Sequence, residues 1–290
     1  MSTAPETLRL LRPGDEAVLE AFLAGHAASS MFLRANLRNA GLVDRGAVYQ
    51  GTYAAVISAG AVAGVAAHFW NDMLVLQAPA GAERLAAAAV AASGRKVAGI
   101  LGPLAQARAA RQALGFAARA TTTDSAEVLF RLELDRLRVP EALARGSVAF
   151  RQAKGEELGL LAEWRVAYAQ ETFRHPASPA LGRASRAEVE RLAGEGALFV
   201  LAVEGRPVSC CSFNARLPEM VQIGNVFTPP SERRRAYARA VVAGALKLAR
   251  QQGVREAILF TGEENEPAQR AYRGIGFEAV GDYALILFAK

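Results

Sequence analysis

Apolar and polar positions alternate along the chain in two series of strand-length and helix-length segments. Short apolar runs bounded by turn residues predict strands, and longer Ala-rich segments predict helices. In the first half, strands are predicted at 8–11, 53–58, 62–70, 73–77, 97–101 and 126–134, and helices at 16–24, 30–39, 82–92 and 106–114. In the second half, strands are predicted at 147–151, 198–203, 207–215, 220–227, 257–261 and 283–288, and helices at 156–170, 186–193, 235–251 and 267–273. Ser185 is the predicted N-cap of the 186–193 helix.

Both halves have the same predicted order, β-α-α-β-β-β-α-β-α-β. Each ends its last helix on a similar phrase, Leu-Gly-Phe at 114–116 and Ile-Gly-Phe at 275–277. Self-similarity over about 150 residues predicts an internal duplication rather than a solenoid repeat. The charged stretch 136–146 is predicted to link a first domain at 1–135 to a second domain at 147–290.

The composition of this 290-residue chain is typical of a globular protein, with 52% hydrophobic and 21% charged residues. No apolar run reaches the roughly 20 residues of a membrane-spanning helix, and no secretory signal is recognisable at the N-terminus. We therefore expect a cytoplasmic protein without a membrane partner. The formal charge of +6 raises the question of nucleic-acid binding. Because the arginines are scattered, and the one cluster at 233–235 lacks an aromatic platform or helix-turn-helix signal, no nucleic-acid partner is expected.

The cysteines and histidines give no spacing that predicts a metal site, so no metal is expected. Cys210 and Cys211 are adjacent, and neighbours on a strand point to opposite faces, so these two residues do not pair. One buried thiol and one facing the other side of the sheet is favoured over a catalytic thiol.

The turn after the predicted 220–227 strand has the features of a phosphate site. Two prolines end the strand, and an Ala-rich helix is predicted to begin near Arg235. The first N–H groups of a helix lack intrahelical partners and carry the positive end of its dipole. Ala236 and Ala238 leave the backbone accessible, and the arginines at 233–235 add permanent positive charge.

This stretch resembles motif A of the GNAT superfamily of acyl-coenzyme A N-acetyltransferases, Gln/Arg-x-x-Gly-x-Gly/Ala. Arg233-x-x-Ala236-x-Ala238 takes that place, and residues 225–230, Asn-Val-Phe-Thr-Pro-Pro, match the strand and loop that precede the motif. Arg234 stands where many members have Gly, and Ala236 replaces the motif Gly. Because alanine adopts helical dihedral angles at little cost, the turn survives these changes if both positions are helical.

Residues 265–277 resemble motif B of the same superfamily, which has an Asn at a strand end, a short helix carrying a Tyr, and a Gly-Phe turn. Pro267 is expected in the first turn of this helix. The resemblance implies that Tyr272 faces the coenzyme and, as a phenol with a pKa near 10, protonates the leaving thiolate. The residues implied to bind the coenzyme are Val226, Phe227, Thr228, Arg233, Arg234, Arg235, Ala236, Tyr237, Ala238, Asn265 and Tyr272.

The catalytic base is less clearly marked. Glu219, just before the 220–227 strand, and Glu171, just after the 156–170 helix, are the candidates, and a solvated surface carboxylate is the alternative for each. The stretch 172–185 is predicted to be a substrate-side loop, in which His175 is a surface residue.

The resemblance implies an α/β (α+β) fold of two tandem GNAT-like domains, each a mixed, mostly antiparallel twisted sheet flanked by helices. The first half lacks the motif-A order at 78–84 and a Tyr in its 106–114 helix. We therefore predict that it is degenerate and serves for packing or for shaping the acceptor cleft.

The leading hypothesis is an acetyl-CoA-dependent N-acetyltransferase that transfers an acetyl group to a primary amine by direct attack in a ternary complex. Acetyl-CoA is then a co-substrate, and the partners are acyl-CoA and a small amine. The alternative is a non-catalytic acyl-CoA-binding sensor or regulatory module. The sequence leaves open the identity of the amine and whether the protein forms a homodimer.

Overall fold

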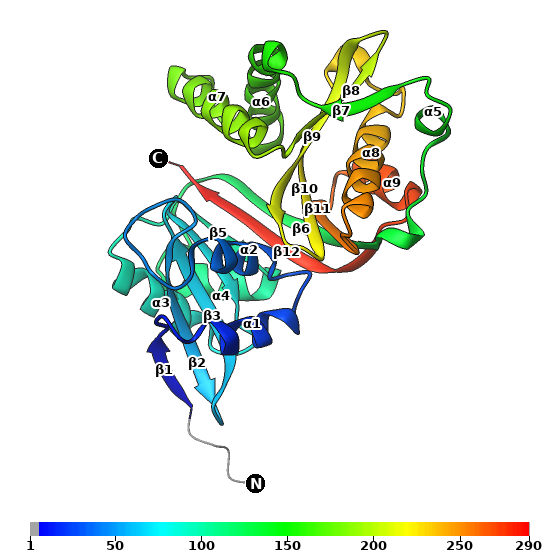
Figure 1. The fold of residues 1–290 in the computed structure, drawn as a ribbon. Helices are drawn as coiled ribbons and strands as arrows, with labels where there is room; N and C mark the ends of the chain where they lie inside the picture. The colour runs from blue at the N-terminus through cyan, green and yellow to red at the C-terminus, as the bar shows by residue number, and fades with distance from the viewer. Residues whose placement is uncertain (1–5, 290) are drawn as a thin grey trace. The chain divides into compact units, whose positions relative to one another are not determined.

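The structure of the protein is a computed structural model that describes residues 6–289. The chain divides into two compact units (Figure 1). The first unit contains the chain up to Leu129 together with the C-terminal segment from Val280, and the second contains Phe130–Ala279. Each unit is a mixed sheet with mostly antiparallel strands and flanking helices, which confirms the predicted fold class.

The sheet of the first unit has the strand order β1-β2-β3-β4-β5-β12-β6, in which β4 and β5 are parallel. Helices α1 and α2 pack on one face through a cluster that includes Leu19 and Leu33. Helices α3 and α4 pack on the other face through a cluster that includes Leu85 and Ile100. The elements are β1 (Thr7–Leu10), α1 (Glu16–Ala24), α2 (Met31–Ala40), β2 (Gly51–Ser58), β3 (Ala61–Phe69), β4 (Met73–Gln77), α3 (Ala82–Ser93), β5 (Gly99–Gly102), α4 (Leu104–Ala113), β6 (Thr121–Glu133) and β12 (Glu278–Phe288).

The sheet of the second unit has the strand order β6-β11-β10-β9-β8-β7, in which β10 and β11 are parallel. Helices α6 and α7 lie on one side of these strands, and α8 and α9 lie on the other (Figure 1). The elements are α5 (Glu141–Ala144), β7 (Ala149–Gln152), α6 (Leu158–Phe173), α7 (Pro179–Gly194), β8 (Leu198–Val203), β9 (Arg206–Arg216), β10 (Met220–Phe227), α8 (Tyr237–Gln251), β11 (Glu256–Gly262) and α9 (Glu266–Gly274), with 3-10 turns at Leu134–Arg136, Gly155–Glu157 and Pro230–Glu232.

The predicted order of helices and strands is present in both halves, and the largest error concerns α7. This helix begins at Pro179 rather than at 186, so half of the predicted 172–185 loop belongs to it. The hydroxyl of Ser178 caps the helix by accepting a hydrogen bond from the N–H of Leu181 at 3.1 Å, and proline suits the first turn. Ser185, the predicted N-cap, is instead a buried residue inside the helix.

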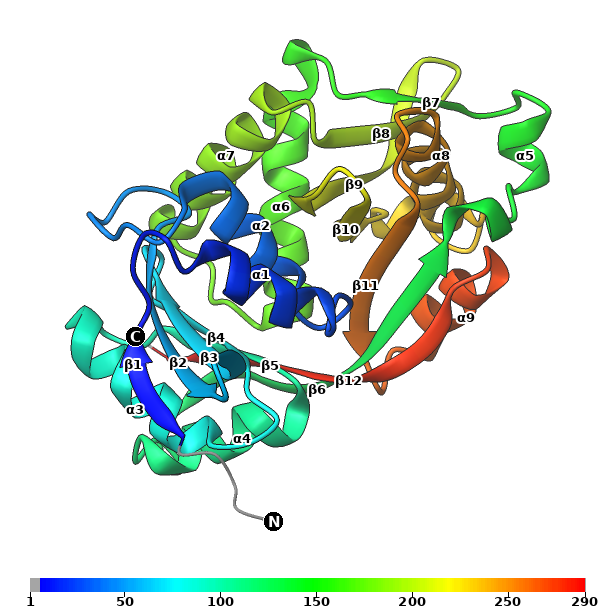
Figure 2. The same ribbon diagram turned by 60° about the horizontal axis from the view of Figure 1, so that its bottom comes forward.

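The last strand of each half pairs outside that half. In the first unit β12 runs antiparallel to β5, with Ala284 opposite Gly102 and Leu287 opposite Gly99 (Figure 2). In the second unit the end of β6 lies beside β11, where Arg131 forms a two-point ion pair with Glu256. The compact units therefore differ from the predicted domains at 1–135 and 147–290 by an exchange of these strand ends.

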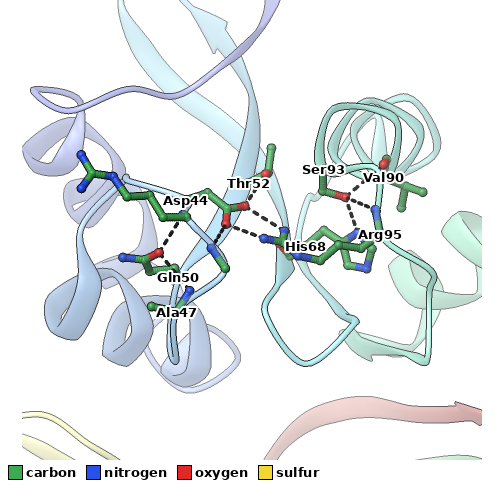
Figure 3. A network of polar contacts seen from close by, with 10 residues as sticks. Asp44, Ala47, Gln50, Thr52, His68, Val90, Ser93 and Arg95 are labelled. Atoms are coloured by element: carbon green, nitrogen blue, oxygen red, sulfur yellow. Dashed lines mark hydrogen bonds and ion pairs between the residues drawn. The ribbon is translucent and has the colours of Figure 1, made fainter.

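Polar contacts in the first unit fix the segment between α2 and β2 against the end of α3 (Figure 3). Asp44 accepts hydrogen bonds from the guanidinium of Arg95, at 2.8 Å to one of its nitrogens, and from the hydroxyl of Thr52 at 2.6 Å. Chiefly through Arg95, these donors hold the pKa of Asp44 below its usual range. The buried ring of His68 lies 2.7 Å from the hydroxyl of Ser93, and burial lowers the pKa of this histidine. The network therefore holds the loop that precedes β2 in place beside the start of β2 and the end of β3.

Candidate active site

Strands β10 and β11 part at their carboxyl ends. They pair over three positions only, from Met220 opposite Glu256 to Gln222 opposite Ile258. Both strands continue beyond that point, β10 to Phe227 and β11 to Gly262, without further pairing to each other in the described part of the chain. Parted carboxyl ends of parallel strands leave backbone N–H and C=O groups available to a ligand.

The parted end of β10 also carries a backbone irregularity. Asn225 has a φ of +50°, and the pairing of β10 with β9 shifts register between Gly224 and Phe227. A bulge of this kind turns individual backbone groups out of the ladder. The side chain of Asn225 is held in place by donating hydrogen bonds to the hydroxyl of Ser212 at 2.9 Å and to the amide oxygen of Asn214 at 3.1 Å.

The turn that follows β10 is left-handed at two residues. Arg234 has a φ of +64° and Ala236 a φ of +60°, while Arg235 between them has a negative φ. The condition that both positions be helical is therefore not met, and α8 begins at Tyr237 rather than at Arg235. Glycine is the usual residue in such positions, because a Cβ atom makes the left-handed region unfavourable by roughly 1–2 kcal/mol.

Alternating left- and right-handed residues point successive N–H groups into a common hollow that favours anions. The N–H groups of Tyr237, Ala238 and Arg239, in the first turn of α8, find no acceptor within residues 6–289. The positive end of the helix dipole adds to their field. The turn and the first turn of α8 together therefore form a backbone site suited to a phosphate group.

Replacing Ala236 with glycine is expected to stabilise the protein by about 0.5–1 kcal/mol, because relief of the left-handed strain exceeds the extra entropy of the unfolded chain. The matched control is Ala245→Gly, in the buried middle of α8, where the same change removes helix propensity and should destabilise by about 1 kcal/mol. Chemical denaturation of both variants measures the two free energies. Equal destabilisation by the two substitutions would contradict a left-handed Ala236.

The three arginines of the turn have different surroundings. Arg233 donates through Nε to the carbonyl of Thr228 at 3.0 Å and pairs with Glu171 at 2.7 Å. Arg235 pairs with Glu232 at 3.4 Å. Arg234 is exposed and forms no ion pair with any residue of the described chain.

Arg239 is a cation that the sequence analysis did not single out. It lies in the first turn of α8, beside Gly274 of α9, and its buried Nε has no hydrogen-bond partner among the described residues. The sequence feature that indicates it is an arginine one position after Ala238, in the first helical turn beside the anion site. Arg234 and Arg239 are thus the cations of this region without a carboxylate partner in residues 6–289.

Helix α9 fixes the predicted tyrosine. Asn265 caps the helix, because its side-chain oxygen accepts a hydrogen bond from the N–H of Ala268 at 3.2 Å. Pro267 lies in the first turn, as predicted. The ring of Tyr272 is buried, with ring centroids 6.1 Å from Phe277 and 6.4 Å from Phe130 in edge-on geometry. Helix α9 also packs on α8, so Tyr272 and the anion site belong to neighbouring helices on one side of the sheet.

The two candidate bases lie at different distances from the parted strands. Glu219 precedes β10 at its paired end, and its carbonyl accepts from the N–H groups of Arg255 and Glu256. Seven residues of extended strand separate it from Val226, a span of roughly 23 Å. Glu171 lies at the end of α6 and is engaged by Arg233. The structure therefore does not bring Glu219 to the site, and it brings Glu171 there as an ion-pair partner.

Two adjoining pockets open on the α6–α7 side of the second sheet. The first lies against the parted end of β10, is mostly apolar and has a cavity volume of about 10 Å³, the space of one water molecule; the second lies between α6 and α7 and has a cavity volume of about 290 Å³. Arg165 lines both pockets. The first is lined by Leu161, Trp164, Arg165, Tyr168, Val189, Leu192, Leu198, Cys210, Asn225 and Phe227, and the second by Arg165, Ala169, Phe173, His175, Leu181, Ala184, Ser185 and Glu188.

The two cysteines are free, buried and on opposite faces of β9. The Sγ atom of Cys210 lies 3.8 Å from the carbonyl of Asn225, and that of Cys211 lies 3.7 Å from the carbonyl of Val241 in α8. Burial raises the pKa of Cys210 to about 12 and that of Cys211 well above its usual value. Both thiols are therefore protonated at neutral pH and poor nucleophiles.

In the first unit, the corresponding ends of the parallel strands β4 and β5 do not part. These strands also pair over three positions, but Gly102 then approaches β4 so closely that a Cβ atom there would lie 2.9 Å from the carbonyl oxygen of Leu76. Just after β4, the backbone N–H of Ala78 donates a hydrogen bond to the side-chain oxygen of Gln106 at 2.6 Å. The ends of β4 and β5 thus remain together, and the N–H group of Ala78 is already hydrogen-bonded to Gln106.

Residues 6–289 contain neither a metal-binding cluster nor a membrane-spanning helix. No group of three or more His, Cys, Asp or Glu side chains is arranged to hold a metal ion. No helix in that range has the length and apolar character needed to cross a membrane.

Comparison with known families identifies the second unit. Residues 160–277 match the model of the acetyltransferase (GNAT) family. These residues are a GNAT domain. The matched segment runs from α6 to the turn after α9, so it includes the parted strands, the left-handed turn and Tyr272.

Individual relatives of the GNAT domain are distant. An uncharacterized N-acetyltransferase of Methanocaldococcus jannaschii is 33% identical over 90 residues, which cover 29% of this chain and 40% of that protein. The chain thus matches less than half of that relative's length. A GCN5-related N-acetyltransferase from Sphaerobacter thermophilus superposes with a TM-score of 0.58 at 17% identity, covering 98% of this chain and 96% of that one. A tandem GNAT protein from the clavulanic acid biosynthesis pathway superposes with a TM-score of 0.55 at 14% identity, covering 98% of each chain. These two structures share the fold over nearly the whole length.

Proposed function

We propose that the second unit is an acetyl-CoA-dependent N-acetyltransferase. The observation that carries this proposal is the alignment of three features along one strand-to-helix connection: the parted end of β10, the left-handed turn at Arg234 and Ala236, and the open N–H groups of α8. The first suits an extended amide chain, and the other two suit a diphosphate. Membership of the GNAT family supports the same ligand.

Residues of the turn are assigned to the diphosphate of the coenzyme. The N–H groups of Tyr237, Ala238 and Arg239 bind its oxygens, and the guanidinium groups of Arg234 and Arg239 balance its charge. Arg233 acts mainly on the protein itself, because it is already bonded to Thr228 and Glu171. Asn265 acts by capping α9 and so positions Tyr272.

Acetyl-CoA supplies the activated thioester at the parted end of β10. Backbone groups around the bulge at Asn225 and Val226 hold the acetyl carbonyl and donate to its oxygen as negative charge develops there. A neutral amine approaches from the α6–α7 side of the sheet and attacks the carbonyl carbon. The C–S bond then breaks, the hydroxyl of Tyr272 gives its proton to the departing sulfur, and the proton lost by the amine restores the hydroxyl through water.

Direct attack is favoured over a covalent intermediate on the protein. The thiol nearest to the pocket, Cys210, is held in the protonated form by burial, which raises its pKa to about 12. A protonated thiol does not attack a thioester efficiently. A ternary complex of protein, acetyl-CoA and amine follows from these properties.

The proposal is tested by binding and by turnover. Acetyl-CoA at about 100 times its Kd is expected to add about 2.7 kcal/mol of stability, which raises the melting temperature by several degrees. Thiol release on adding amines separates an enzyme from an acyl-CoA sensor, since a sensor is stabilised without releasing CoA.

A matched pair of variants controls for non-specific effects. Ala238→Glu puts a carboxylate among the open N–H groups and should abolish the shift in melting temperature. Ala187→Glu, at an exposed position of α7, should leave it unchanged. Absence of any shift in the wild-type protein would overturn the proposal.

A further inference from the structure

The second pocket, between α6 and α7, has room for a small organic molecule. Its cavity volume of about 290 Å³ corresponds to about ten water molecules, and it lies at the lower end of the range for small-molecule sites. One face of each helix lines it. The lining residues of α6 are spaced by four, at 165, 169 and 173, and those of α7 follow helical spacing at 181, 184, 185 and 188.

Arg165 brings a positive charge into this pocket. Its guanidinium lies over the rings of Tyr168 and Phe173, 5.4 and 6.0 Å from their centroids. Its buried Nε atom has no hydrogen-bond partner among residues 6–289, and no carboxylate of these residues forms an ion pair with it. Because a guanidinium stays charged at any working pH, a partly buried one is unfavourable until an acceptor binds.

Two other titratable side chains line the second pocket, Glu188 and His175. The carboxylate of Glu188 accepts hydrogen bonds from the guanidinium of Arg191 at 3.1 and 3.3 Å, so its charge is balanced within α7. A doubly charged anion is disfavoured here, because it would lie in the same pocket as this carboxylate. His175 follows the end of α6 and packs edge-on against Phe173, with ring centroids 6.1 Å apart.

The rest of the lining is apolar apart from one hydroxyl group. Ser185, inside α7, supplies the hydroxyl, and the apolar residues are Ala169, Phe173, Leu181 and Ala184. A planar guanidinium matches the single charge and planar shape of a carboxylate. An apolar wall matches the hydrocarbon part of an organic acid, whereas an inorganic ion would leave most of this wall in contact with water.

The second pocket does not reach the proposed site of transfer. No residue of β10 lines it. The first pocket, which lies between Arg165 and the end of β10, holds only one water molecule. A molecule in the second pocket therefore occupies a site of its own.

We propose that the second pocket is a binding site for a small organic monocarboxylate, separate from the acetyl-CoA site. The carboxylate binds the guanidinium of Arg165 and the hydroxyl of Ser185, and the apolar part of the ligand packs against Phe173, Leu181 and Ala184. The ligand is bound without chemical change, so the inference does not depend on the transfer activity proposed above.

Matched acids and amides test the proposal. Binding of benzoate, phenylacetate and isovalerate is compared with that of benzamide, phenylacetamide and isovaleramide by ligand-detected NMR, in the absence of acetyl-CoA. The acids are expected to bind about 10- to 100-fold more tightly than the amides, as for hydrogen bonds to a charged group. Replacing chloride by sulfate at constant ionic strength should change the Kd of the acids by less than about two-fold.

Variants locate the effect at Arg165. Arg165→Gln is expected to weaken the acids about 10- to 100-fold and to leave the amides within about two-fold. Arg165→Lys keeps the charge without the planar fork and should fall between the two. Arg183→Gln, at an exposed position of α7 outside the lining, carries the same charge change and should bind the acids as the wild type does. Melting temperatures verify that each variant is folded.

A second pair of variants fills the pocket without changing Arg165. Ala184→Phe, at an exposed position of the lining, is expected to weaken the acids at least about 10-fold, because the new ring occupies space that the ligand needs. Ala187→Phe, at an exposed position of α7 outside the lining, should leave their affinity unchanged.

Three results would overturn the proposal. Acids that bind no better than the amides, or not at all, would show that the pocket does not recognise a carboxylate. Equal weakening of both classes by Arg165→Gln would leave Arg165 a packing role alone. Displacement of the acids by sulfate would indicate a site for inorganic anions. Because every measurement is made without acetyl-CoA, failure of this proposal is distinguishable from failure of the proposed transfer activity.

Discussion

Replacing Tyr272 with phenylalanine is expected to lower kcat about 100-fold and to leave the Kd for acetyl-CoA within about two-fold of the wild-type value. The ring of Tyr272 is buried against Phe277 and Phe130, and phenylalanine preserves both edge-on contacts. The substitution therefore removes the proton donor for the departing sulfur while the shape of the site is kept. Steady-state thiol release gives kcat, and calorimetric titration gives the Kd.

A control for this variant is Tyr53→Phe, in the first unit. The hydroxyl of Tyr53 is buried and has no hydrogen-bond partner among residues 6–289, so its removal should leave turnover unchanged and cost no stability. Turnover of the Tyr272→Phe variant equal to that of the wild type would exclude this residue as the general acid. A parallel loss of acetyl-CoA affinity would show that the hydroxyl acts in binding instead.

Removal of residues 280–290 is expected to unfold the first unit and to spare most of the second. Strand β12 is the antiparallel partner of β5, and Ile286 and Phe288 belong to the buried cluster beneath α3 and α4. Loss of one such side chain costs about 3 kcal/mol, so loss of the whole strand exceeds much of the stability of a typical domain. Hydrogen exchange resolved along the chain measures protection in each unit.

Milder variants of the full chain support the same test. Ile286→Ala should destabilise the first unit by about 3 kcal/mol, whereas Val280→Thr, at a position that is 49% exposed, should change stability by less than about 0.5 kcal/mol. If the truncated chain kept native protection in β4 and β5, β12 would not be part of the first unit. If instead β9 and β10 lost protection, the strand would belong functionally to the second half.

The candidate site could be outlined from the sequence because the residues proposed to form it lie close together in the chain. The strand end at Phe227, the turn and the first residues of α8 are contiguous, so their spacing alone indicates a phosphate site. The left-handed angles of Arg234 and Ala236 were not predicted, because neither residue type favours that region. Their only signal was the glycine that the GNAT family often has at these positions.

Features that depend on packing between distant segments could not be predicted from the sequence. Within residues 6–289 the buried Nε of Arg165 has no hydrogen-bond partner, while Glu188 pairs with Arg191 and Glu171 with Arg233; such pairings depend on how the helices pack. The pairing of β12 with β5 could not be predicted either, because an apolar strand pattern indicates burial but does not identify the neighbouring strand. The element order of each half was recoverable, since it follows from periodicity and turn residues alone.

The position of β12 also sets the order in which the protein can be completed during synthesis. One of the two partners of β5, the strand β12, leaves the ribosome roughly 180 residues after β5 itself. At 5–20 residues per second, the first unit waits about 10–40 s with an unpaired edge. Exposed edges of this kind promote association between chains. Nascent chains that stop before residue 288 should therefore depend on chaperones, and the amino-terminal half should mature no earlier than the carboxyl-terminal one.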